Sequence, residues 1–235
     1  MTDNPFILPR PIERSHQVSG LHVQQALPLD DGAFPHPVLM VHGAFHGWWA
    51  YARWLTWFAT LGVPAFALSV RNHEGSRSLS AEESRETGIE HYVEDIATVL
   101  DWIGKPAVLI GHSLGGLMVQ KAAEDRNALA VACIGSASPA GVGPTRDFTW
   151  DEDEPLMFDR ARMRGAVFEE IDDAKFEAIY GRMLTRRASR PRCCFWEPNM
   201  TGSGCIRPKN LRRSSAPTIS MFRERATTCC WKTAD

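Results

Sequence analysis

Short apolar runs alternate with longer amphipathic segments over roughly the first 135 residues of the chain. The runs predict buried strands, because a strand covered on both faces reads as continuous hydrophobic sequence; they are residues 38–41, 64–70, 107–110 and 129–134. The segments between them predict helices at residues 48–61, 88–103 and 114–125. Strands that alternate with helices of this length indicate a parallel sheet with helices on both faces.

Weaker signals lie on either side of this alternation. Residues 17–18 and 21–23 flank Ser19-Gly20, a turn-forming pair, and predict an edge hairpin. From residue 141 to about residue 184 the pattern changes to acidic segments with helical periodicity. We interpret these segments as a helical cap inserted into an α/β core that spans residues 1–185.

Length and composition restrict the class of protein. A chain of 235 residues with 44% hydrophobic and 23% charged residues fits one domain with a sizeable core. The net charge of −2 gives no reason to expect a nucleic-acid or membrane-surface partner. No apolar run approaches the roughly 20 residues that span a bilayer, and the N-terminus lacks the pattern of a secretory signal. We therefore expect a cytoplasmic protein with reduced thiols. The oligomeric state is not indicated.

Residues 111–116 read Gly-His-Ser-Leu-Gly-Gly, between a predicted strand and a predicted helix. In this G-x-S-x-G context a strained turn lifts the serine hydroxyl above the sheet, and the glycines let the backbones approach. The helix N-terminus that follows favours negative charge. We therefore predict Ser113 as a nucleophile; the alternative is a glycine-rich turn with an incidental serine.

Together with His42-Gly43-Ala44-Phe45 after the 38–41 strand, this motif resembles the α/β-hydrolase family, in its branch of small esterase- and lipase-like enzymes with a cap. The resemblance covers roughly residues 30–185 and implies a doubly wound, mostly parallel sheet. It implies a serine–acid–histidine triad in that chain order and an oxyanion hole from the N–H groups of Leu114 and Ala44, or else of Phe45. The implied substrate is a small ester, lactone or related acyl compound, with no cofactor or metal.

Other residues near these motifs are interpreted by position. We expect His42 to bridge loops and His112 to pack beneath the elbow, and neither to be the base. Candidates that line a pocket are Phe45, His46 and His73. Structural roles in the core or pocket wall are expected for Trp48, Trp49, Trp54, Trp57 and Cys133.

The C-terminal part departs from the family pattern. All eight histidines precede or adjoin the serine, so no residue after Ser113 can serve as the family's late general base; they are His16, His22, His36, His42, His46, His73, His91 and His112. Residues 1–185 carry 15 Lys+Arg and 25 Asp+Glu, whereas residues 186–235 carry 11 and 3. Five of the six cysteines also lie in residues 186–235.

We interpret residues 186–235 as a frameshifted translation of a normal hydrolase C-terminus. Reading each codon's third base with the next two bases allows Leu-Leu-Leu-Gly-Ala-Glu-His-Asp-Arg from Cys193 onwards, an apolar strand and an acid-bearing turn. The same shift from Phe222 onwards allows Pro-Gly-Ala-Gly-His-Tyr-Met-Leu-Leu-Glu-Asp-Gly, which contains a Gly-His pair. A metal site is disfavoured because the cysteine doublets lack C-x₂-C spacing. A nucleic-acid-binding tail is disfavoured because the arginines are scattered without an aromatic-interleaved motif.

These observations predict a serine hydrolase that forms an acyl-enzyme and is nearly inactive as written, because its catalytic histidine and acid are absent. The alternative is a non-catalytic α/β-hydrolase-fold protein that binds a small molecule. In either case we expect the family's last strands and helix to be missing and residues 186–235 to be disordered. The 129–134 strand would then form an open sheet edge.

Overall fold

The computed structural model describes residues 11–29, 34–126, 128–139, 142, 160–166 and 168–184. Six strands of this part form one sheet in the order β1-β2-β4-β3-β5-β6. They are β1 (Ile12–Val18), β2 (Leu21–Leu27), β3 (Val38–Val41), β4 (Ala65–Ser69), β5 (Val108–His112) and β6 (Ala130–Ile134). The pairs β1–β2 and β2–β4 are antiparallel, and the pairs β3–β4, β3–β5 and β5–β6 are parallel.

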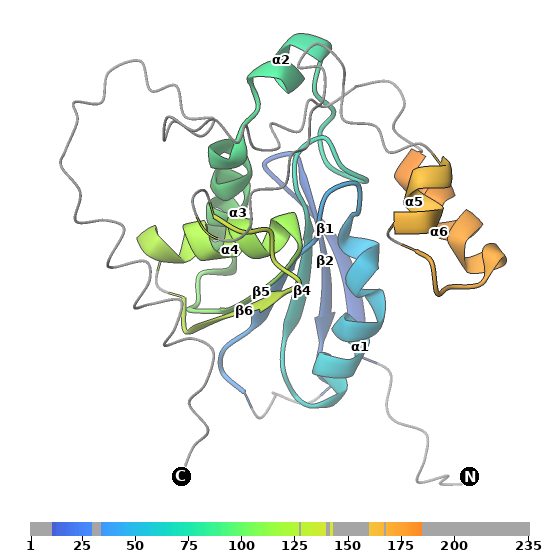
Figure 1. Ribbon diagram of the computed structural model, residues 1–235. Coiled ribbons are helices and arrows are strands. Elements are labelled where there is room, and N and C mark those ends of the chain that lie inside the picture. Colours follow the sequence, from blue (N-terminus) through green and yellow to red (C-terminus); the bar gives the residue numbers. More distant parts are fainter. Residues whose placement is uncertain are drawn as a thin grey trace, which may run out of the picture.

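Helices cover both faces of this sheet (Figure 1). The 3₁₀ helix η1 (Trp48–Tyr51) and α1 (Ala52–Thr60) cover one face, and α3 (Ile89–Ile103) and α4 (Leu114–Asp125) the other. Each face has its own apolar cluster. One joins Tyr51, Leu55 and Ala59 to β3 and β4, and the other joins Ile96, Val99, Met118 and Val119 to the opposite side of the same strands. The predicted doubly wound, mostly parallel architecture is therefore confirmed.

The predicted helix over residues 48–61 is two elements, because a 3₁₀ turn precedes α1. A further short helix, α2 (Ala81–Glu86), was not predicted, since its sequence has no apolar face. Its start did carry a signal in Ser80 and Glu83. Ser80 Oγ accepts from the Glu83 N–H at 3.1 Å, and Glu83 Oε2 accepts from the Ser80 N–H at 2.7 Å, which is a capping box.

Three residues expected in the core are exposed. Trp54 and Trp57 are 41% and 55% exposed, because α1 turns Leu55 and Ala59 toward the sheet and leaves the tryptophans on its outer side. Cys133 is also exposed. It lies on β6, the last strand of the described sheet, whose side chains are mostly uncovered. The prediction of these residues as core is wrong.

The predicted cap is described only in part. Its helices α5 (Arg160–Ala166) and α6 (Asp173–Leu184) lie on the side of the sheet that carries α1 (Figure 1). Residues 143–159 of the cap, and residues 186–235, lie outside the described residues. Over the ranges that the structure does describe, no helix has the length and apolarity to cross a membrane. A metal-binding group of histidine, cysteine or acidic side chains is likewise absent from these ranges.

Candidate active site

Ser113 stands between β5 and α4 in a strained conformation. Its φ of 53° and ψ of −119° place it in the left-handed half of the backbone map, which costs a non-glycine residue about 1–3 kcal/mol. Three backbone hydrogen bonds hold it there. The Ser113 N–H donates to Ile134 O at 3.0 Å, and Ser113 O accepts from the N–H groups of Gly116 at 3.0 Å and Ala137 at 2.9 Å. The serine of the predicted motif is thus held at a strand-to-helix elbow.

The glycines of the motif are required by close backbone approach. A Cβ at Gly115 would overlap the carbonyl oxygens of Val41 and His42, and one at Gly111 would overlap the Gly115 carbonyl. A Cβ at Gly116 would lie 2.6 Å from Ser136 Oγ. The elbow can therefore pack against β3 and the residues after β6 only if these positions lack side chains.

The loop after β3 contacts the elbow through Gly43. A Cβ added there would lie 3.0 Å from Ser113 Cβ and 3.1 Å from His112 Nδ1. The next residue, Ala44, is half-buried against the core, and Phe45 has a positive φ of 63°. Leu114 is the first residue of α4, where a backbone N–H has no acceptor within the helix. The two predicted oxyanion-hole segments therefore meet beside Ser113.

His42 bridges two loops and is not available as a base. It is 1% exposed. Its Nδ1–H donates to Gly43 O at 2.7 Å, and its Nε2 accepts from the Val70 N–H at 3.2 Å. In this neutral tautomer both ring nitrogens therefore have a hydrogen-bond partner. Burial, and secondly the nearby His73, holds the pKa of His42 well below its ordinary value.

His46 lies beside the elbow with one ring nitrogen fixed. Its Nδ1–H donates to Ala44 O at 2.8 Å, which leaves Nε2 as the unprotonated nitrogen. Its ring centroid lies 5.4 Å from that of Trp49 and 6.0 Å from that of His112. Burial lowers the pKa of His46. His112 is exposed on the side of His46 and Gly43, so the prediction that it packs beneath the elbow is wrong.

His73 belongs to a buried layer with His42. It is 9% exposed, and its ring centroid lies 4.7 Å from that of His42 and 6.3 Å from that of Tyr92. Its Nδ1–H donates to Arg71 O at 3.0 Å. Of the three residues predicted to line a pocket, Phe45 and His46 lie in the loop that meets the elbow, and His73 supports that loop through His42.

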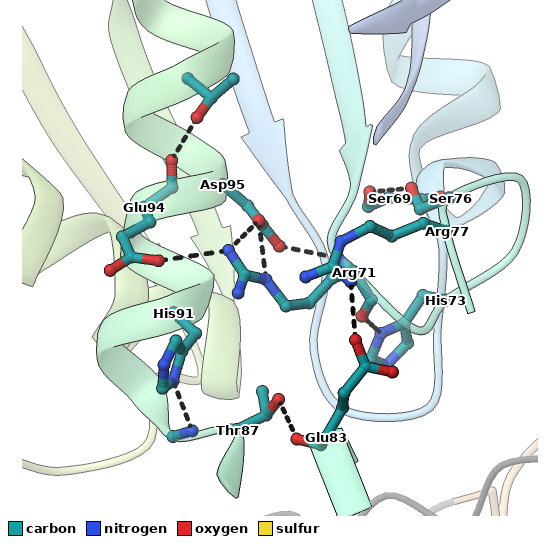
Figure 2. Close-up of polar contacts among 12 residues, drawn as sticks. Ser69, Arg71, His73, Ser76, Arg77, Glu83, Thr87, His91, Glu94 and Asp95 are labelled. Atoms are coloured by element: carbon teal, nitrogen blue, oxygen red, sulfur yellow. Dashed lines mark hydrogen bonds and ion pairs between the residues drawn. The ribbon is translucent and has the colours of Figure 1, made fainter. Parts of the chain in front are cut away.

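A buried ion pair, which the sequence analysis missed, ties the loop after β4 to α3 (Figure 2). Asp95 is 3% exposed and accepts from the Arg71 backbone N–H at 2.7 Å and from its Nε and Nη2 at 2.9 and 2.7 Å. Burial raises the pKa of Asp95, although the hydrogen bonds from Arg71 oppose that shift. The available signal was an aspartate on the apolar face of the predicted 88–103 helix. The pair fixes the backbone beside His73.

Helix α6 and the turn between α5 and α6 reach the site through two further contacts that were not predicted. The ring centroid of Phe168, between α5 and α6, lies 6.5 Å from that of His46. Arg182 of α6 pairs with Glu74 at 2.8 Å, and its guanidinium carbon lies 4.8 Å from the centroid of the Trp49 ring. Among the described residues the Ser113 hydroxyl has no hydrogen-bond partner that could act as a base.

The sequence model of a family described as "Alpha/beta hydrolase family" matches residues 38–222. No curated protein matches the sequence.

Solved structures similar to this chain include two epoxide hydrolases and one further hydrolase. The epoxide hydrolase from an endophytic Streptomyces is 23% identical, with a TM-score of 0.43 over 52% of this chain and 36% of that one. Epoxide Hydrolase A from Mycobacterium thermoresistibile is 27% identical, with a TM-score of 0.42 over 52% and 38%. A predicted CIB-like hydrolase from Thermoplasma acidophilum is 20% identical, with a TM-score of 0.45 over 55% and 64%. The match thus spans less than two thirds of each of these chains.

Proposed function

The chain belongs to the alpha/beta hydrolase family, and we propose that its activity is hydrolysis of a small ester, lactone or related acyl substrate with Ser113 as the nucleophile. The observation that carries this proposal is the strained backbone of Ser113 at the elbow. A positive φ at a non-glycine residue is retained only where the surroundings enforce it, and such strain gathers at functional sites.

In the proposed reaction the Ser113 hydroxyl attacks the acyl carbonyl carbon, and its proton passes to a base. The N–H groups of Leu114 and Ala44 donate to the oxyanion of the tetrahedral intermediate. As this intermediate collapses to an acyl-enzyme, the base returns the proton to the departing alcohol oxygen. Water then attacks the acyl carbon, which releases the acid and restores the Ser113 hydroxyl. Loss of one oxyanion-hole donor typically costs about 10²–10³ in rate. Placement of the Gly43 loop against the elbow supports the assignment of these donors.

The described residues supply no base for the Ser113 hydroxyl. A triad histidine must come within about 2.6–3.2 Å of the serine hydroxyl, and the described residues place none there. His42 is occupied on both nitrogens, and the family's histidine position falls within residues 186–235. We therefore propose that the chain as written turns over esters weakly or not at all, and that the frame change explains this.

A second candidate function is binding of a small molecule without turnover. The Ser113 hydroxyl favours it, since the elbow is intact while no hydrogen-bond partner or base for that hydroxyl lies among the described residues. Retention of an acyl compound without release of alcohol would support this candidate. Covalent labelling of Ser113 by an acyl probe would support the hydrolase.

The deciding experiment compares nitrophenyl-ester turnover by three chains: the chain as written, a version with the reading frame restored after about residue 185, and the restored version with Ser113→Ala. We expect turnover only in the restored chain. Full activity in the chain as written would refute the account of inactivity, and a restored chain indifferent to Ser113→Ala would refute the nucleophile. Sequencing the codons for residues 180–235 tests the frame change independently.

A further inference from the structure

Arg182 of α6 contacts the core at an acidic side chain and two indole rings. The guanidinium pairs with Glu74 at 2.8 Å and lies 4.8 Å from the Trp49 ring centroid and 6.0 Å from that of Trp48. Glu74 is far from Arg182 in sequence and lies in the loop after β4. A cation held both by a carboxylate and by the faces of indole rings is fixed in direction as well as in charge.

The core side of this contact is held in place by its own bonds. The backbone N–H of Trp48 donates to Ser69 Oγ at 2.9 Å, and the Trp48 ring stacks on His22 with centroids 5.6 Å apart. Gly75, directly after Glu74, has a φ of 85°, and a Cβ there would lie 2.6 Å from the His22 ring. The loop carrying Glu74 is thus pressed against β2, so Arg182 binds a positioned acceptor.

A continuous series of contacts leads from Arg182 to the oxyanion loop. Arg182 lies over the Trp49 ring, the Trp49 ring stacks on His46 at 5.4 Å, and His46 Nδ1–H donates to Ala44 O at 2.8 Å. The Ala44 peptide is the segment whose N–H is the proposed oxyanion donor. Phe168 of the cap packs on the same His46 ring, with centroids 6.5 Å apart.

We propose that Arg182 is a positioning residue: by binding Glu74 and the Trp48 and Trp49 rings, it fixes α6 over the loop of residues 43–47 and holds the Ala44 peptide in place. This rests on the proposed function only for its catalytic consequence. The physical coupling between the cap and the loop exists whether or not Ser113 reacts. Coupling through packed side chains is established by a measurement at each end. The experiment therefore follows both α6 and the loop after β3.

Hydrogen exchange followed by mass spectrometry on the full chain provides that measurement. Arg182→Gln removes the charge and the planar fork, and we expect exchange of amides in residues 43–51 and 173–184 to rise about fivefold, the effect of losing one partly exposed ion pair and one cation–π contact. Glu74→Gln should raise both segments by less. Arg182→Lys should lie between Arg182→Gln and the native chain, because Lys keeps the charge but not the fork.

The matched control is Arg126→Gln, which removes an ion pair of the same 2.8 Å length to Asp101, between α4 and α3. It should leave both segments unchanged. Unchanged exchange of residues 43–51 in Arg182→Gln, or an equal rise in Arg126→Gln, would overturn the proposal. A rise confined to α6 would also overturn it, because the loop would then be independent of the cap.

A second readout uses the frame-restored chain. There Arg182→Gln should lower kcat for a nitrophenyl ester several-fold with a smaller change in KM, because it disturbs an oxyanion donor more than substrate contact. An effect on KM alone would count against positioning. If the restored chain shows no Ser113-dependent turnover, the proposed hydrolysis fails while the exchange experiment still decides the role of Arg182.

Discussion

Acid should destabilise this fold through His42. Burial holds its pKa well below the ordinary value of 6.5, secondly assisted by His73. In the unfolded chain the imidazole titrates near 6.5. As the pH falls below that value, the unfolded chain binds a proton that the folded chain cannot. A group with a lowered folded pKa therefore contributes stability that is complete above 6.5 and is lost as the pH falls.

The magnitude follows from linkage. At about pH 5.5 the protonated form of His42 exceeds its neutral form about tenfold in the unfolded chain. The free energy of unfolding therefore falls by RT ln 11, about 1.4 kcal/mol. Burial also lowers the pKa values of His22 and His46, so each of them likewise reduces the free energy of unfolding as the pH falls. The structural source of the His42 effect is its burial and secondly the nearby His73; the hydrogen bond to Gly43 O opposes the shift.

Urea unfolding followed by far-UV circular dichroism at about pH 7.5 and about pH 5.5 measures this difference. His42→Gln should lower stability at the higher pH by about 1–3 kcal/mol, because buried polar groups lose their partner. The same substitution should also reduce, by about 1.4 kcal/mol, the difference in unfolding free energy between the two pH values. His36→Gln is the control, since His36 is exposed before β3. An undiminished pH difference in His42→Gln, or equal narrowing in the control, would refute the reasoning.

Three further outcomes are expected. Asp95→Ala should lower the free energy of unfolding by about 3 kcal/mol, because it removes the buried partner of the Arg71 guanidinium and leaves only the longer contact with exposed Glu94. Glu94→Gln should cost less than about 1 kcal/mol by the same urea assay. Gly115→Ala should reduce the yield of folded protein, because the added Cβ meets backbone carbonyls, while Gly165→Ala, which meets nothing within 4 Å, should not. Ile134→Lys on β6, the last strand of the described sheet, should reduce aggregation seen by light scattering.

The fold was predictable where one local rule decides the element. The strands at β3 and β4 are buried along their whole length, so their apolar runs could mean little else. The elbow was predictable for a different reason: the spacing of Gly111, Ser113 and Gly115 follows from backbone contacts that tolerate no Cβ. Both features are recognisable within a short stretch of sequence, although the contacts of Gly115 are with Val41 and His42 on another strand.

What escaped prediction depends on partners that are distant in sequence. Asp95 is an apolar-face aspartate until Arg71, on another element, is placed beside it. Arg182 resembles any helix-surface arginine until α6 is set against Glu74 and Trp49. The exposure of Cys133 likewise follows from the place of β6 in the sheet order, which a strand's own sequence does not state. Periodicity identifies a face and not the residue that will cover it.

The parts of the candidate site differ in the same way, since some are held by backbone contacts and the base depends on a distant side chain. The strained serine, its glycines and the loop at Gly43 come from β3, β5 and the turns that follow them, and they meet through close contacts within the first 137 residues. A triad base has to arrive from a different segment and meets the serine through one side chain, so its loss removes proton transfer without removing the contacts that hold the elbow. Strain at Ser113 is maintained by the hydrogen bonds to Ile134, Gly116 and Ala137, none of which involves a base. An intact elbow is therefore evidence for a nucleophile's position and gives no information about whether the reaction proceeds; the activity of the frame-restored chain is what separates the two.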